Sequence, residues 1–149
     1  MDVASITKEA VLISEHASLR EAVAAMMENP TNTLLVIDDA GVLIGEVSVS
    51  DLLDAVIPAT LDGDQVIEYF TSEDQFHAAI QDAEDRTVSE FMSTDFTPVS
   101  ADASLVAIAA NAIGFQRARI PVVDHDGRPI GIISRQGLKQ ILAKTLKIT

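Results

Sequence analysis

The sequence lacks cysteine and tryptophan and is poor in aromatic residues of any kind. Without cysteine, the chain of 149 residues forms neither a disulfide framework nor a thiolate site. With 4% aromatic residues, it offers few rings on which several nucleic-acid bases could stack. No apolar run approaches the roughly 20 residues that span a bilayer, and no signal peptide is evident. These absences favour a cytoplasmic protein that is not inserted into a membrane.

Positive charge is also scarce: the chain has 10 Lys and Arg residues and 23 Asp and Glu residues, which gives a net charge of −13. Sequence-independent binding to nucleic acid needs Lys and Arg at the phosphates, so the charge argues against it and against anionic membranes. Hydrophobic residues nevertheless make up 48% of the chain, which indicates a folded core. Residues 54–90 sum to −9 and residues 91–149 to +3, so the last third can still hold a local anion site.

An internal repeat organises the chain. When the sequence is shifted by 86 residues, twelve of the 39 positions from 14 to 52 meet an identical residue. In the first copy these are Ser14, Ala17, Ser18, Leu19, Ala24, Val36, Asp38, Gly41, Ile44, Gly45, Ser48 and Leu52. Both the glycines and the apolar pattern survive the shift, which indicates a duplicated unit.

Each copy is predicted to run strand, helix, strand, strand, helix. In the first copy a short strand at 11–13 precedes a helix that begins with Ser18 and Glu21 at capping-box spacing. Apolar residues then recur at helical spacing: Leu19, Ala22, Val23, Met26 and Met27. Short apolar strands follow on either side of a turn at Gly41, and a last helix covers 51–57.

The second copy repeats this order, with an almost uniformly apolar helix at about 105–113. That helix is predicted to be more buried than its counterpart. Residues 59–87 belong to neither copy and are predicted to form two short helices, at about 64–70 and 73–84, in an acidic insert. The segments Val3–Ile6 and Val88–Met92 lead into the two copies in the same way.

The duplicated unit resembles a CBS domain, and the whole chain resembles a tandem CBS pair, or Bateman module. In the first copy the matching residues are Gly41, Gly45, Val47, Ser48, Asp51 and Leu52. In the second they are Ile120, Pro121, Val122, Val123, Asp124, Gly127, Gly131, Ile132, Ile133, Ser134 and Leu138. The resemblance implies an α+β fold of two pseudo-symmetric β-α-β-β-α repeats packed sheet to sheet, with clefts between them. The expected division is repeat 1 at 1–58, the helical acidic insert at 59–87 and repeat 2 at 88–149.

The resemblance also implies a function. Members of this family commonly bind adenosine-containing ligands (AMP, ADP, ATP or S-adenosylmethionine) in the clefts and commonly form homodimers. A stand-alone sensor that passes a conformational change to a partner enzyme or transporter is therefore expected. No catalytic residue, metal or required cofactor is implied, since the adenine nucleotide would be a regulatory ligand. The sequence itself contains no nucleophile–base pair and no metal-ligand spacing that would favour an enzyme.

Ser48 and Asp51 are the leading site candidates. They lie about one turn apart at a strand-to-helix junction, where a carboxylate can accept both hydrogen bonds of a ribose diol. The resemblance makes Asp51 the ribose ligand and Ser48 a phosphate-side contact, whereas the simpler alternative is that both residues only cap the helix. Gly137 replaces the aspartate in the second copy, so we expect one good nucleotide site per chain. Gly137 could instead mark a loose helix start.

Basic and apolar residues complete the candidate set. The polar candidates of the second copy are Arg117, Arg119, Ser134 and Arg135. Arginine binds phosphate through two parallel hydrogen bonds, although solvated surface charge is an equally good interpretation. An apolar slot for adenine could come from Leu12, Ile13, Leu34 and Leu35, for which core packing is the alternative.

A second hypothesis needs no ligand. The insert combines acidic residues with apolar positions at helical spacing. The chain could therefore be a dimerisation or docking module whose acidic insert binds a basic partner protein. Deleting residues 62–85 is expected to abolish capture of such a partner while leaving the fold intact.

Overall fold

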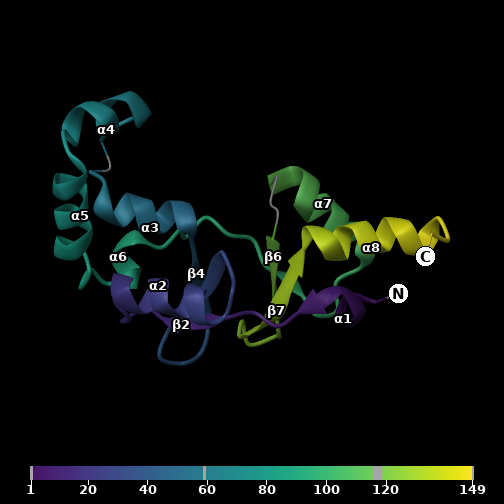
Figure 1. Ribbon diagram of the computed structural model, residues 1–149. Coiled ribbons are helices and arrows are strands. Elements are labelled where there is room, and N and C mark those ends of the chain that lie inside the picture. The colour runs from purple at the N-terminus through teal and green to yellow at the C-terminus, as the bar shows by residue number, and fades with distance from the viewer. Residues whose placement is uncertain (1, 59, 116–118, 149) are drawn as a thin grey trace. The chain divides into compact units, whose positions relative to one another are not determined.

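The computed structural model describes residues 2–58, 60–115 and 119–148, which form two compact units (Figure 1). One comprises Val11–Val36 and Gly45–Thr94, and we call it the Asp51 unit. The other comprises Met1–Ala10, Ile37–Ile44 and Asp95–Thr149, and we call it the Ser134 unit.

The first copy has the predicted order of elements. Its sheet runs in the order β2 (Leu12–Ser14), β3 (Thr33–Ile37), β4 (Leu43–Ser48), with helices α2 (Leu19–Glu28) and α3 (Val49–Val56). The capping box at the start of α2 is formed as predicted, because Ser18 Oγ accepts from Glu21 N and the Glu21 carboxylate accepts from Ser18 N. Only part of the apolar stripe is buried: Leu19, Ala22 and Met26 are buried, whereas Val23 and Met27 are exposed.

The insert forms two helices within the Asp51 unit, α4 (Gly63–Tyr69) and α5 (Glu73–Asp82), close to the predicted bounds. Its aromatic rings meet edge to face, with Phe70 4.9 Å from Tyr69 and 5.1 Å from Phe76 between ring centroids. The apolar positions of the insert therefore pack partly on one another.

The residues after α5 tie the insert to α2. Leu19 N donates to Arg86 O at 2.8 Å, and Arg20 N donates to Glu84 O at 3.0 Å. The Arg20 guanidinium also pairs with the Glu84 carboxylate at 3.0 Å, and Ala83 is buried beside them. These contacts satisfy two of the first backbone donors of α2, which have no partner within the helix.

The second copy builds the sheet of the Ser134 unit. Its order is β1 (Thr7–Lys8), β7 (Pro129–Ser134), β6 (Arg119–Val123), β5 (Val99–Ser100), with helices α1 (Val3–Ile6), α7 (Leu105–Phe115) and α8 (Arg135–Thr145). β6 and β7 form an antiparallel hairpin, and β5 joins β6 in parallel. The core consists of Val3, Ile6, Val99, Ile108, Ile120, Val122 and Ile133.

Helix α7 corrects one expectation. It was predicted to be more buried than α2, yet Val106 and Ile113 are 78% and 79% exposed, while Ile108 is fully buried. The reason is that α7 packs one face on the sheet, and within the described part of the unit nothing covers the other face. No helix in the described ranges has the length and apolar character needed to cross a bilayer.

Each lead-in segment packs on the sheet of the other copy. In the Ser134 unit, β1 from the N-terminus pairs antiparallel with β7, so that Thr7 faces Ile133 and Lys8 faces Ile132. In the Asp51 unit, α6 (Val88–Phe91) is followed by Ser93, which exchanges two backbone hydrogen bonds with Glu46 of β4, at 2.8 and 2.9 Å. The two copies thus exchange their first residues.

This exchange explains the repeated glycines Gly45 and Gly131. A Cβ on Gly131 would overlap the Lys8 carbonyl oxygen, and a Cβ on Gly45 would lie 2.6 Å from Met92 Sδ and 3.1 Å from the Ser93 carbonyl oxygen. A side chain at either position would displace the lead-in that lies across it.

The hairpin turns repeat for a different reason. Gly41 and Gly127 have φ values of 83° and 82°, which side chains rarely adopt. Asp38 and Asp124 each accept two backbone hydrogen bonds within the turn, through Oδ1. The bond from Arg128 N is the main cause that lowers the pKa of Asp124.

We predict that Gly131→Ala destabilises the protein by about 1–3 kcal/mol, because the new methyl group must move the β1 backbone. Gly63→Ala is the matched control, since a Cβ on Gly63 would meet nothing within 4 Å. Denaturant unfolding measures both variants. Equal stability of the two variants would contradict the close approach at Gly131.

Candidate functional site

The junction between β4 and α3 is closed by a complete capping box. Asp51 N donates to Ser48 Oγ at 3.2 Å. In return, Asp51 Oδ2 accepts from Ser48 N at 2.8 Å and from Ser48 Oγ at 3.1 Å. The interpretation of these two residues as helix caps is therefore realised in the structure.

Capping leaves chemical capacity at Asp51. All of these contacts of the Asp51 carboxylate go through Oδ2, and a carboxylate has about four acceptor sites on its two oxygens. The residue is half-buried, so the carboxylate is within reach of a ligand. Ser48 is more constrained, because its hydroxyl both donates to Asp51 and accepts from it.

The second copy differs at this junction for a steric reason. Gly137 is buried, and a Cβ there would lie 2.9 Å from the Ile6 carbonyl oxygen and 3.3 Å from Ile133 Cγ2. Helix α1 therefore occupies the space that an aspartate side chain would need. Gly137 is a position of close backbone approach, which a loose helix start does not require.

Without a carboxylate at position 137, Ser134 has no capping partner. It is the N-cap residue of α8 but makes no side-chain cap hydrogen bond, and its Oγ is buried without a partner among the described residues. The strand register places Arg119 directly opposite Ser134, and Arg135 follows it in the chain. Three of the predicted polar candidates are thus brought together in the Ser134 unit, at the start of an 11-residue helix. Arg117 lies outside the described residues.

The apolar candidates lie on the first two strands of the Asp51 unit. Leu34 and Leu35 of β3 are fully buried, and Ile13 of β2 is buried as well. Leu12 is 44% exposed, so it alone among the four presents a large exposed surface. A role for these residues in holding adenine stays a prediction.

A cavity that sequence reasoning did not find borders the same junction. It has a volume of about 560 Å³ and lies between α2 and α3. Its walls are formed by Val23, Met26, Met27, Pro30, Thr31, Asn32, Val49 and Leu52. Val49 and Leu52 are adjacent in the sequence to the candidates Ser48 and Asp51. The lining residues on α2 belong to its apolar stripe, which the sequence indicates as a packing surface and not as a cavity wall.

The family model described as CBS domain matches this sequence twice, over residues 2–58 and 88–144. The chain belongs to the CBS domain family. The two matches coincide with the two copies of the internal repeat and leave out most of the insert. A search of the curated proteins gives no match.

Solved structures of CBS proteins share this fold. The CBS-pair protein CBSX2 from Arabidopsis thaliana is 23% identical with a TM-score of 0.74, over 98% of this chain and 96% of that one. The CBS domain of a CBS domain containing membrane protein from Sphaerobacter thermophilus is 25% identical with a TM-score of 0.71, over 91% and 83%. The CBS domain pair of MJ0100, in complex with 5-methylthioadenosine and S-adenosyl-L-methionine, is 18% identical with a TM-score of 0.69, over 97% and 98%.

We predict that the same substitution has unequal effects at the two equivalent serines. Ser48→Ala should destabilise the protein by about 0.5–2 kcal/mol, because it removes the cap of α3. Ser134→Ala should leave stability nearly unchanged, because no hydrogen bond from its hydroxyl within the described residues is lost. Thermal and denaturant unfolding measure the stability of both variants. A larger loss of stability in Ser134→Ala than in Ser48→Ala would contradict the difference in capping.

Proposed function

We propose that this chain is a regulatory module that binds an adenosine-containing ligand, with the Asp51 carboxylate as acceptor for the ribose diol. The observation that carries the proposal is a half-buried aspartate with unused acceptor capacity, at the helix start of a CBS repeat. Related structures support the ligand class: CBSX2 was solved in complex with AMP, and the cytosolic domain of the Mg²⁺ channel MgtE in complex with ATP.

Binding at Asp51 would act on α3. The carboxylate that accepts the ribose hydrogens also accepts from Ser48 N and Oγ, so ligand and helix start share one group. A second ligand contact on the same carboxylate changes the geometry that the cap favours. A ligand shifts a conformational equilibrium only by its differential affinity for the two states, and this shared group supplies such a difference.

The far end of α3 is connected to the end of the insert. The Arg86 guanidinium donates to the Ala55 carbonyl oxygen at 2.8 Å, and its Nε lies 3.3 Å from Glu90 Oε2. Helix α3 also packs on α6. A displacement of α3 would therefore reach Arg86 and the segment that leads into the second copy. We propose that a conformational change passes along this path to a partner enzyme or transporter. The module would act in the cytoplasm as a homodimer and would not catalyse a reaction itself.

We predict that Asp51→Asn weakens binding of the adenosine ligand at least about tenfold, because hydrogen bonds to a charged acceptor are roughly twice as strong as those to a neutral one. The amide oxygen can still accept at the cap, so the fold should persist. Calorimetric titration with AMP, ADP, ATP and S-adenosylmethionine measures the effect.

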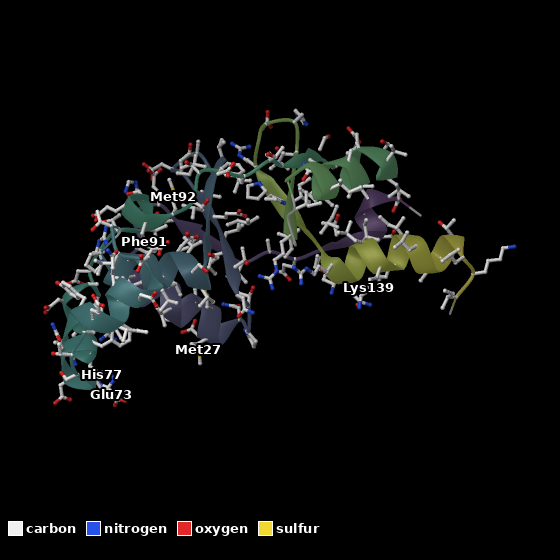
Figure 2. The ribbon with its side chains drawn as sticks, turned by 90° about the horizontal axis from the view of Figure 1, so that it is seen from above. Met27, Glu73, His77, Phe91, Met92 and Lys139 are labelled. Carbon is white, nitrogen blue, oxygen red and sulfur yellow. The ribbon has the colours of Figure 1, made fainter. Side chains whose placement is uncertain are left out.

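Glu73→Gln is the matched control, because it removes one carboxylate from the exposed surface of α5. Figure 2 shows Glu73 beside His77 and apart from Phe91 and Met92 at α6. The control should bind as the native chain does. Unchanged affinity in Asp51→Asn, with its fold intact, would remove Asp51 from the site.

A second candidate function belongs to the insert. On α4, Ile67 is 76% exposed between the exposed acids Asp64 and Glu68. An exposed apolar side chain among acidic residues suits a basic, amphipathic partner segment. We propose that this face docks a partner protein when the module acts as a scaffold.

Deleting residues 62–85 does not test docking cleanly, because it removes Glu84, whose backbone carbonyl and carboxylate both bind Arg20 at the start of α2. The double substitution Ile67→Ser with Tyr69→Ser changes the exposed face and leaves these contacts in place. Affinity capture compares the native chain with this variant. A partner retained equally by both would rule out the α4 face as its docking site.

A further inference from the structure

The C-terminal end of the chain is basic and contains no acid. Residues 127–149 include no Asp or Glu and five bases: Arg128, Arg135, Lys139, Lys144 and Lys147. The last four lie on α8 or just after it, and all four are exposed. Within the described residues none of these four pairs with a carboxylate. Helix α8 therefore presents positive charge that the described part of the chain leaves uncompensated.

Apolar residues lie between these bases on the exposed side of α8. Leu142 and Leu146 are both mostly exposed, three and seven residues after Lys139. Side chains at this spacing share one face of a helix. The opposite side of α8 packs on the core of the Ser134 unit through Leu138 and Ile141. Figure 2 shows Lys139 on the side of α8 that points away from α7. The exposed face of α8 is thus both basic and apolar.

The insert has the same pattern with the opposite charge. Residues 60–85 include no Lys or Arg and eight acids: Asp62, Asp64, Glu68, Glu73, Asp74, Asp82, Glu84 and Asp85. Among the described residues, only Glu84 of this set pairs with an arginine or lysine. On α4 the exposed Ile67 shares a face with the exposed acids Asp64 and Glu68, which lie three residues before it and one after. An acid–apolar–acid face on α4 therefore matches a base–apolar–base face on α8.

Like charge restricts how two copies of this chain can meet. Each copy has a net charge of −13, so most pairs of surfaces repel one another. The acidic insert of one copy is attracted only to a basic surface of the other, and residues 127–149 form the longest acid-free stretch of the sequence. Two copies related by a two-fold axis bring insert and α8 together twice. The two contacts then form in one assembly and reinforce each other.

We infer that the exposed face of α8 docks on the acidic insert of a second copy of this chain, in a reciprocal pair. This inference rests on the docking function proposed for the α4 face, and it identifies the basic, amphipathic partner segment as α8 of the second copy. In this pairing Ile67 of one copy and Leu142 and Leu146 of the other leave water, and opposite charges surround them. The insert lies between the two family matches, so the contact is a property of this chain and not of the CBS repeat itself.

The test measures self-association of the full chain by sedimentation over a range of protein concentrations. Asp64→Lys with Glu68→Lys makes the insert face basic, and Lys139→Glu with Lys147→Glu makes the α8 face acidic. Each pair of substitutions should weaken self-association about tenfold or more, because attraction becomes repulsion at both reciprocal contacts. Circular dichroism verifies that both variants are folded.

Mixing the two reversed chains is the decisive step. In a mixed pair the native acidic insert meets the native basic α8, and the reversed, basic insert meets the reversed, acidic α8. Opposite charges then face each other at both contacts. The mixture should therefore associate about as strongly as the native chain, although neither variant does so alone. A mixture that associates no better than its components would overturn the inference.

The sign of the net charge separates local contacts from general repulsion. Each acid-to-lysine substitution adds two positive charges, so the insert reversal changes the net charge from −13 to −9. General repulsion alone would then make self-association stronger, whereas the proposed contact makes it weaker. Glu9→Lys with Glu28→Lys is the matched control, since both are exposed acids outside the insert. It should not weaken self-association, and a loss equal to that of the insert reversal would contradict the local contact.

Failure of the inference is distinguishable from failure of the proposed function. A native chain that stays monomeric at every concentration overturns the inference. So does a native oligomer that only the α8 reversal weakens, because α8 then contacts a surface other than the insert. Docking itself is measured by affinity capture. If a different protein is captured by a monomeric native chain and lost in Ile67→Ser with Tyr69→Ser, the docking function stands and the second copy is not the occupant.

Discussion

The close approach of each lead-in backbone to a glycine is the constraint on which the rest of this structure depends. A Cβ on Gly131 would overlap the Lys8 carbonyl oxygen, and a Cβ on Gly45 would lie 2.6 Å from the Met92 sulfur and 3.1 Å from the Ser93 carbonyl oxygen. Backbone hydrogen bonds hold each lead-in in place: β1 pairs with β7, and Ser93 exchanges two hydrogen bonds with Glu46. The sheet of the second copy therefore includes β1 from the N-terminus, and the sheet of the first copy is joined at Glu46 by a single bridge from Ser93.

The same exchange accounts for the difference between the two candidate sites. In the Ser134 unit the lead-in helix α1 lies on α8 so closely that the Ile6 carbonyl oxygen excludes any side chain at position 137. In the Asp51 unit the lead-in helix α6 also packs on α3, yet Asp51 keeps its side chain and closes a capping box. The presence of one carboxylate, and not two, follows from how tightly each lead-in approaches the last helix of the repeat.

The order of helices and strands could be predicted from the sequence, because it depends on local signals. Short apolar runs, the capping pair Ser18 and Glu21, and the glycine turns are local signals, and they predict the element order correctly. The apolar positions of the insert likewise predict its two helices. The exposure of Val106 and Ile113 could not be predicted, because composition says that a helix is apolar and not how many of its faces are covered. The steric role of Gly137 was equally invisible, since it depends on a residue 131 positions earlier in the chain.

Charge shows how the arrangement of the chain changes a conclusion drawn from composition. Summed along the sequence, most of the acidic excess, −9, lies in residues 54–90, which are the insert and its flanks. Summed over the compact units, the whole excess belongs to the unit that holds Asp51, because the basic last third folds with the N-terminal segment into the other unit. The Asp51 carboxylate and the arginines of the second copy are therefore carried by different units. The two arginines of the Asp51 unit are already paired with acids of the same unit, Arg20 with Glu84 and Arg86 with Glu90.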